Sequence, residues 1–323
     1  MKAIIKKELA DHFGSTRFLL IMSLVFMVSF LITHLTGQSI REVLSQGGSA
    51  FLEGRTFLLL FTATGAFFSL TLFLSIFGPL VSIVLGFDSI NRERNLGTLS
   101  KILAQPIHRD EVILGKYLAG LITLAIMLTA LMLLLAGLGL VGVGVVPTFD
   151  EVMRLCLFWV LSIVYMGFWL GLSILLSIYF RSVATSAMAA AALWIFIIFF
   201  VPVLGQAAAS AMAPMNDPSR PTARELTTYN RIDKAITMIS PAGLYTQSSS
   251  ILLDPTHRGS DQSFRYALMN QLDRYLLTHF QGGITLSQSF ILVIPDILLL
   301  LGFSIITFIL SYEAFVRQEV RSV

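Results

Sequence analysis

The chain has 323 residues, of which 55% are hydrophobic and only 13% are charged, and its mean hydropathy is +0.80. About a quarter of the residues in an ordinary soluble domain are charged, so this composition excludes a water-soluble fold. The net charge of +3 is modest, and we expect no nucleic acid partner. The single cysteine, Cys156, excludes an intrachain disulfide and a paired-cysteine metal site.

Six long apolar runs predict membrane-spanning helices, because a helix needs about 20 residues to cross the hydrocarbon core. Each run is apolar around its whole circumference and lacks the alternation of a β-barrel strand. The predicted spans cover residues 18–36, 61–87, 112–146, 155–180, 184–205 and 290–312. We therefore predict an all-α polytopic membrane protein with six transmembrane helices. A membrane domain at residues 1–205 holds the first five spans, and residues 290–323 form the sixth span and a tail.

The distribution of basic residues predicts the orientation of the spans, because lysine and arginine concentrate on the cytoplasmic side of a membrane. One set of span ends carries Lys2, Lys6, Lys7, Arg17, the loop at residues 88–116, Arg181, Arg317 and Arg321. The short loops on the other side carry only Arg41, Arg55 and Arg154. We predict an integral protein of a prokaryotic cytoplasmic (inner) membrane with both termini in the cytoplasm.

The first residues of the chain favour a helix that lies along the membrane surface. Ile5, Leu9 and Phe13 recur at a spacing of four residues, while Lys2 and Lys6 fall on other faces. This amphipathic pattern predicts an interfacial helix on the inner leaflet that contacts the lipid bilayer. The alternative is a basic flank that only sets the topology.

Pro79 and Pro295 each lie within a predicted span. Gly78 and Pro79 lie within the second span, where proline frees a backbone carbonyl and bends the helix, so this pair is a hinge or a simple bend. Asp296 follows Pro295 near the start of the sixth span, and we expect its carboxylate to cap that helix.

Residues 206–289 form the one sizeable polar segment and predict an extracytoplasmic helical cap between the fifth and sixth spans. One apolar stripe ends at Ser240-Pro241, and a second precedes Gly282-Gly283. The stripes comprise Leu226, Tyr229, Ile232, Ile236 and Ile239, and then Leu268, Leu272, Leu276 and Phe280. The cap is a candidate surface for an extracytoplasmic partner.

The chain lacks the motifs of a nucleotide-hydrolysing or metal enzyme. Gly115-Lys116 is followed by Tyr117 and lacks the upstream glycine of a phosphate loop. No His-Glu-x-x-His sequence occurs, and the five histidines are scattered without the spacing of metal ligands. We therefore predict no catalytic residue, no cofactor and no metal site in this chain.

The loop at residues 88–116 is the most informative stretch, since two spans need only a few polar residues to turn around. It carries five basic and four acidic residues, with a short predicted helix from Glu93 to Leu103 that Gln105-Pro106 ends. Asp110 and Glu111 open the next helix, where its dipole favours acidic groups. We predict an ordered element on which a partner docks.

The loop contains the pattern Glu93-x-x-x-Gly97-Thr98-Leu99, then Ile102-Leu103, Pro106-Ile107-x-Arg109-x-Glu111 and Gly115-Lys116. This pattern resembles the loop between spans two and three of ABC exporter permeases of the second type (ABC-2), and the predicted topology agrees over nearly the whole chain. The resemblance implies a coupling helix that sits in a groove of a separate ATPase subunit. It also implies two ATPase subunits and a second permease, either a copy or a paralogue.

On this resemblance, the coupling-loop residues are Arg92, Glu93, Gly97, Thr98, Leu99, Ile102, Leu103, Pro106, Arg109 and Glu111. We expect Gly97 to permit a close approach or an unusual backbone dihedral, and Leu99 to fill an apolar pocket on the ATPase. Glu93 is expected to pair with a cation of the partner, or alternatively with neighbouring arginines and lysine at the surface.

These observations favour a permease that couples ATP hydrolysis on a partner to export or to force transmission. Two alternatives remain at this stage: an ATPase-independent secondary transporter or channel, and a membrane scaffold or assembly protein. The scarcity of ionisable residues within the spans disfavours an ion-coupled carrier, because such residues line proton and ion pathways. An ordered charged loop also has no role in a secondary transporter or channel, whereas the scaffold alternative stays open.

Overall fold

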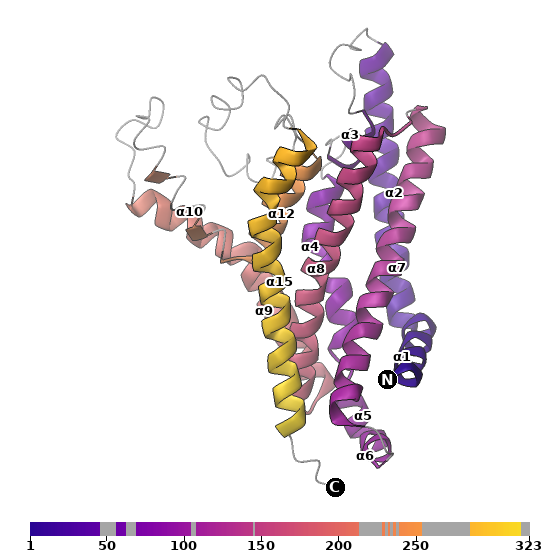
Figure 1. Cartoon of the computed structure of the whole chain (residues 1–323), viewed down its shortest axis with the longest axis vertical. Coiled ribbons are helices and arrows are strands. Elements are labelled where there is room, and N and C mark those ends of the chain that lie inside the picture. The colour runs from indigo at the N-terminus through magenta and orange to yellow at the C-terminus, as the bar shows by residue number, and fades with distance from the viewer. Residues whose placement is uncertain are drawn as a thin grey trace.

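The computed structural model describes residues 1–45, 56–62, 69–104, 108–144, 146–212, 228–229, 232, 235–236, 239–253 and 285–317. Within these residues the fold is a bundle of helices with no strand, which confirms the predicted all-α class (Figure 1). Six helices are long and apolar enough to cross a membrane, as predicted. They are α2 (Thr16–Ser45), α4 (Leu70–Gly86), α7 (Arg109–Val143), α8 (Phe149–Tyr179), a bent fifth span and α15 (Leu286–Arg317).

Helix α8 lies at the centre of the bundle and packs against α4, α7 and α15. Its side chains Phe158, Tyr165 and Trp169 are fully buried, and they form the middle of one continuous apolar core. The outer helices keep many large apolar side chains exposed, including Leu20, Met27, Leu133 and Leu298. This distribution is typical of a lipid-immersed bundle, in which apolar side chains remain favourable on the outside.

Short helices mark the two ends of the bundle. At one end lie α1 (Lys2–Gly14), α5 (Asn91–Asn95), α6 (Thr98–Leu103) and the last turn of α15 (Figure 1). At the other end lie α3 (Thr56–Thr62) and the connection between α7 and α8. The helix predicted at the N-terminus is therefore present as α1, and it packs on α7. Its location at a membrane surface stays a prediction.

Buried Glu151 explains why α8 begins six residues before the predicted span. Thr148 and Glu151 form a capping box, in which the Thr148 hydroxyl accepts from the Glu151 N–H and the Glu151 carboxylate accepts from the Thr148 N–H. The other carboxylate oxygen of Glu151 accepts from the N–H groups of Phe57 and Leu58 at 3.1 and 3.4 Å. One acidic side chain thus caps both α8 and α3, since these N–H groups have no partner within their own helix.

The second predicted span, residues 61–87, is not one helix. Helix α3 ends at Thr62, and α4 begins at Leu70 after an extended Ser69 whose hydroxyl accepts from the Leu72 N–H at 3.2 Å. An N-cap serine of this kind starts a new helix. The predicted hinge or bend at Gly78 and Pro79 lies inside α4, which continues through it.

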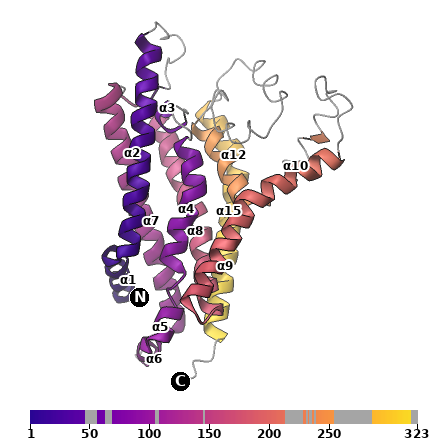
Figure 2. The same ribbon diagram turned by 180° about the vertical axis from the view of Figure 1, so that it is seen from behind.

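The fifth span bends, so the straight helix predicted at residues 184–205 is replaced by three segments. Helix α9 (Val183–Ile195) passes into a π-helical turn, η2 (Phe196–Phe200), and then into α10 (Val201–Met212). In both views α10 projects away from the other helices (Figures 1 and 2). A π-helical turn is a recognised cause of such bends.

Helix α12 (Pro241–Leu253) falls within the region predicted as an external cap, but it packs inside the bundle against α4, α8 and α15. Leu244, Tyr245 and Leu252 are buried there. Of the two apolar stripes predicted on either side of α12, the whole of the second and Leu226 of the first lie outside the described residues.

Asp296 does not cap the sixth span, contrary to the expectation from sequence. Helix α15 begins ten positions earlier, at Leu286, and Asp296 is buried within it. Its carboxylate accepts from the Ser248 hydroxyl of α12 at 2.9 Å. The sequence missed this role because α12, which supplies the partner, was not predicted.

Cysteine labelling tests whether the two ends of the bundle lie on opposite sides of a membrane. Ser100 in α6 and Val146 before α8 are both exposed. In a Cys156→Ser background, Val146→Cys should react with an impermeant maleimide in intact cells, and Ser100→Cys only after permeabilisation. A charged reagent does not cross the apolar core, so reaction of both cysteines in intact cells would contradict this topology.

Candidate functional site

The loop between α4 and α7 folds into α5 and α6, and α5 is tied to the end of α8. The N–H groups of Ile90 and Asn91 both donate to the Ser177 hydroxyl, at 3.0 and 3.2 Å. The Arg94 guanidinium donates to the Ile178 carbonyl, and the Asn95 amide donates to the Arg181 carbonyl. The last carbonyls of a helix lack donors within it, so α5 satisfies groups that α8 leaves open.

Gly97 forms the turn between α5 and α6 with a φ of 68°. A side chain at this position would meet no atom within 4 Å, so the requirement is for the left-handed backbone and not for space. The Thr98 hydroxyl donates to the Glu93 carbonyl at 3.2 Å and closes the turn. Of the two expectations for Gly97, the structure therefore contains the unusual dihedral.

Two leucines beside this turn, Leu96 and Leu99, have opposite environments. Leu99 is only 2% exposed and belongs to the core of its own chain, so it is not available to fill a pocket on a partner. Leu96 is 67% exposed, although it directly precedes the same turn. Among the loop side chains that the structure describes, Leu96 is the large apolar one that is exposed.

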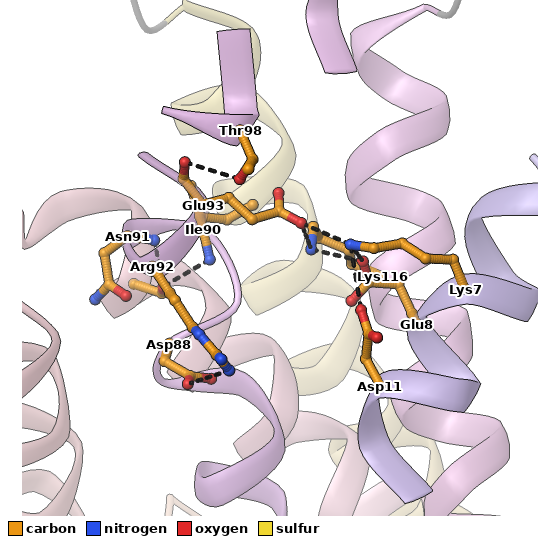
Figure 3. A network of polar contacts seen from close by, with 11 residues as sticks. Lys7, Glu8, Asp11, Asp88, Ile90, Asn91, Arg92, Glu93, Thr98 and Lys116 are labelled. Carbon is orange, nitrogen blue, oxygen red and sulfur yellow. Dashed lines mark hydrogen bonds and ion pairs between the residues drawn. The ribbon is translucent and has the colours of Figure 1, made fainter. Parts of the chain in front are cut away.

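Four charged side chains from three elements meet behind the loop (Figure 3). The Lys116 ammonium of α7 lies 2.9 Å from Glu8 Oε1 of α1 and 3.0 Å from Glu93 Oε1 of α5. The Lys7 ammonium lies 3.0 Å from each of the same two oxygens. Lys7, Glu8, Lys116 and Glu93 thus form a closed ring of alternating charges, called here the charge ring.

The charge ring is buried on the side of α7 and open on the side of α1. The Lys116 side chain is only 3% exposed, whereas that of Lys7 is 52% exposed. Burial alone would raise the pKa of Glu8, but attraction to Lys116 and Lys7 outweighs it and lowers this pKa below its ordinary value. Burial alone would lower the pKa of Lys7, but Glu8 and Glu93 raise it. Glu8 and Lys7 are therefore both ionised at neutral pH.

A groove of about 850 Å³ lies beside the charge ring, between α1 and the segment from α4 to α5. Asp88 accepts there from Arg17 at 3.0 Å and lies 3.8 Å from Arg92, and the Arg17 guanidinium lies 5.7 Å from the centre of the Phe87 ring. The charged groups that line the groove are Lys7, Arg17, Arg92 and Lys116 against Glu8, Asp11, Asp88 and Glu93. These charges balance, so the groove has the mixed surface of a protein contact and not that of an anion site.

The other predicted coupling residues lie around this site. Arg109 donates to the Val316 carbonyl of α15 at 3.3 Å, and Glu111 pairs with the N-terminal ammonium at 2.8 Å. The Arg92 side chain is exposed at the rim of the groove. Ile102 and Leu103 belong to α6, whereas Pro106 lies outside the described residues.

The face of α1 that packs inwards differs from the predicted apolar stripe. Ile5 and Leu9 are half-buried and Phe13 is exposed, whereas Ile4 contacts α7 near Gly115 and Glu8 is buried in the charge ring. The sequence reasoning missed Lys7, Glu8 and Lys116. The available signal was Glu8 itself, which follows Ile4 by four residues and so shares its face.

Among the described residues, no group of three or more His, Cys, Asp or Glu side chains is arranged to hold a metal ion. The site brings together ion pairs, a left-handed turn and the exposed side chain of Leu96. These features suit contact with another protein.

Comparison with known families agrees with this picture. A family model described as ABC-2 family transporter protein matches residues 2–320, which is nearly the whole chain. The chain therefore belongs to the ABC-2 transporter family, and it is a membrane-spanning permease component of an ABC transporter. No curated protein sequence matches it significantly.

Substitution of the two lysines of the charge ring tests what the ring contributes to stability. Lys116→Met removes the buried positive charge that balances the carboxylates of Glu8 and Glu93. Loss of one partner of a buried ion pair lowers the free energy of unfolding by about 3–5 kcal/mol. Lys7→Gln removes an exposed partner of the same carboxylates and should cost about 0–1 kcal/mol. The measurement is the thermal unfolding midpoint of each purified variant in detergent. Equal midpoints for the two variants would show that Lys116 is not the buried centre of the ring.

Proposed function

We propose that this permease is half of the membrane part of an ATP-driven exporter, and that α5 and α6 transmit the motion of a separate ATPase subunit. The observation that supports this most directly is the two-sided character of the loop. One side is bound to α1, α7 and α8 by the charge ring and by Ser177. The same loop leaves Leu96 and Arg92 exposed to the surroundings, and the groove opens beside the charge ring.

A loop can transmit force only if it moves as one body with the helices behind it. Here α5 follows α4 through a single turn, contacts the end of α8 by hydrogen bonds, and reaches α7 through the Glu93–Lys116 pair. ATP binding would then change the permease conformation by the difference between the contacts that the ATPase makes with its two states. Leu96 serves as the apolar anchor of that contact.

The proposed assembly follows the family resemblance: two permeases, alike or paralogous, with two ATPase subunits on the cytoplasmic side. The end that carries α1, α5 and α6 is the cytoplasmic end in this proposal, and α1 lies at the inner leaflet with Ile5, Leu9 and Phe13 toward lipid. We place the candidate surface for an extracytoplasmic partner at residues 206–289, with the exception of α12 and the start of α15, which pack inside the bundle. The exposed apolar face of α9 and α10 supports a contact with the second permease.

An apolar, charge-poor membrane domain supports a hydrophobic or lipid-like cargo that moves along the contact between the two permeases. The same membrane domain is also compatible with a transporter that moves little cargo and transmits force to an external partner. Both versions are forms of one coupling mechanism, in which the chain itself performs no covalent chemistry.

Variants of the loop surface test the docking proposal. Leu96→Asp removes the apolar anchor, and truncation of such an anchor typically costs ~1–3 kcal/mol of binding free energy. Gly97→Val adds a β-branched residue at a positive φ and should distort the turn. Both variants should insert normally into the membrane but recover much less ATPase subunit with the tagged permease.

The matched control for this experiment is Val146→Asp, which places the same charge on an exposed apolar residue at the other end of the bundle. This control should recover the wild-type amount of ATPase. Wild-type recovery by both loop variants would mean that the loop is a passive connector.

ATP binding by the separate components tests where hydrolysis takes place. The purified permease alone should neither bind nor hydrolyse ATP, because its sequence has no phosphate loop. The complex with its ATPase should hydrolyse ATP. Saturable micromolar binding of a fluorescent ATP analogue to the isolated permease would contradict this assignment.

A further inference from the structure

The proline within α4 leaves one backbone carbonyl without its helix partner. Pro79 has no N–H group, so the carbonyl of Ser75, four residues earlier, loses the hydrogen bond that the helix would supply. The hydroxyl of Tyr165, on α8, donates to this carbonyl at 2.8 Å. Tyr165 and Ser75 are both buried, so this hydrogen bond is shielded from water. A side chain of another helix therefore completes α4 at its break.

A second aromatic residue supports the same break. The indole N–H of Trp194, on α9, donates to the next carbonyl, that of Ile76, at 3.0 Å. The broken turn of α4 is thus held by donors from two different helices. Its geometry depends on where α8 and α9 stand, because both donors are carried by side chains of those helices.

The ring of Tyr165 also contacts the inserted helix α12. It stacks on the ring of Tyr245 with centroids 4.3 Å apart and planes 12° from parallel. The Tyr245 hydroxyl lies 2.9 Å from the Ser162 hydroxyl, which is one turn before Tyr165 on α8. Tyr245 is fully buried as well. One side chain, Tyr165, therefore touches both the break in α4 and the middle of α12.

Further polar contacts hold α12 on the same side. Its Ser248 hydroxyl donates to Asp296 of α15 at 2.9 Å, and its Leu252 carbonyl accepts from Arg154 of α8 at 3.1 Å. Arg154 also donates to the Ser289 hydroxyl of α15 at 3.0 Å. Tyr245, Ser248 and Leu252 are spaced by three and four residues, so they lie on one face of α12. The helix is thereby fixed to α8 and α15 as one unit.

From these contacts we infer that Tyr165 is a positioning residue. Its hydroxyl binds α4 at the turn that Pro79 interrupts and its ring binds α12, so it fixes the position of one helix relative to the other. This pair of contacts is called here the joint. The half of α4 after Pro79 leads through one turn into α5, and α4 packs against α12. A displacement of α5 then reaches the helix inserted at the far end through the Ser75 carbonyl, Tyr165 and Tyr245. The source of that displacement rests on the proposed function, whereas the joint itself does not.

A double-mutant cycle tests the joint in the purified full-length chain. Tyr165→Phe removes the hydroxyl and keeps the stacked ring, so Ser75 loses its donor. Pro79→Ala restores an N–H group that can donate to the same carbonyl. Tyr165→Phe should lower the thermal unfolding midpoint by roughly 2–4 °C in the wild-type background, and by much less in the Pro79→Ala background.

The control is Tyr117→Phe, which removes a hydroxyl that donates to the Gly167 carbonyl at 3.3 Å, and the residue four positions after Gly167 is not a proline. Its effect should be the same in both backgrounds. If Tyr165→Phe lowers the thermal unfolding midpoint equally in the wild-type and Pro79→Ala backgrounds, the inference that Tyr165 compensates for Pro79 is wrong.

Cysteine reactivity tests whether motion passes through Tyr165. In a Cys156→Ser background, Ser250→Cys on α12 reports on the position of that helix in the reconstituted permease–ATPase complex. Its rate of modification should change several-fold between the nucleotide-free state and the state trapped with ATP and vanadate. Tyr165→Phe should abolish this change while ATP hydrolysis persists. A change that survives in Tyr165→Phe would overturn the relay.

The two proposals fail in different ways. If no ATPase copurifies with the wild-type permease, the proposed function is contradicted. The double-mutant cycle, measured by thermal unfolding, then tests the contacts of Tyr165 by itself. If the ATPase binds and hydrolyses ATP but Ser250→Cys reacts at one rate in all states, the proposed function stands and the relay is contradicted.

Discussion

The arrangement of this protein depends on one buried ammonium group, that of Lys116. A lysine without a partner in an apolar bundle would be strongly destabilised, so carboxylates must reach it. Glu8 comes from α1 and Glu93 comes from α5, and both stand within 3.0 Å of Lys116. Satisfying this one charge therefore fixes the N-terminal helix and the surface loop on the same side of α7. The elements proposed to face an ATPase are held together by this requirement.

Buried polar groups play the same part at the far end of the bundle. Glu151 caps both α8 and α3, while Arg154 and Asp296 hold α12. Apolar side chains alone do not specify such an arrangement, because lipid tails are as apolar as leucine and offer an equivalent environment. Hydrogen bonds and ion pairs do discriminate, since their donors and acceptors find no partners in lipid. The specific contacts of this bundle are accordingly its few polar ones.

The break in α4 has a different origin. Proline cannot donate a hydrogen bond, and Tyr165 of another helix supplies a donor to the carbonyl that Pro79 leaves open. A helix completed by its neighbour responds to movement of that neighbour. In the inferred relay, a movement of α4 therefore reaches α12 through Tyr165, without an ion pair between the two helices.

The sequence by itself determined the helical class, the number of spans and the family, because hydrophobic length and the loop motif are local properties of the chain. It also placed proline inside α4. Tertiary structure alone decided which loop leucine is exposed, which carboxylates meet Lys116, and that α12 and Asp296 lie inside the bundle. Leu96 and Leu99 are three residues apart and chemically identical, so only the position of the neighbouring helices separates them. Glu8 and Lys116 are 108 residues apart, and no local pattern pairs them, because a charge selects its partner by distance in space.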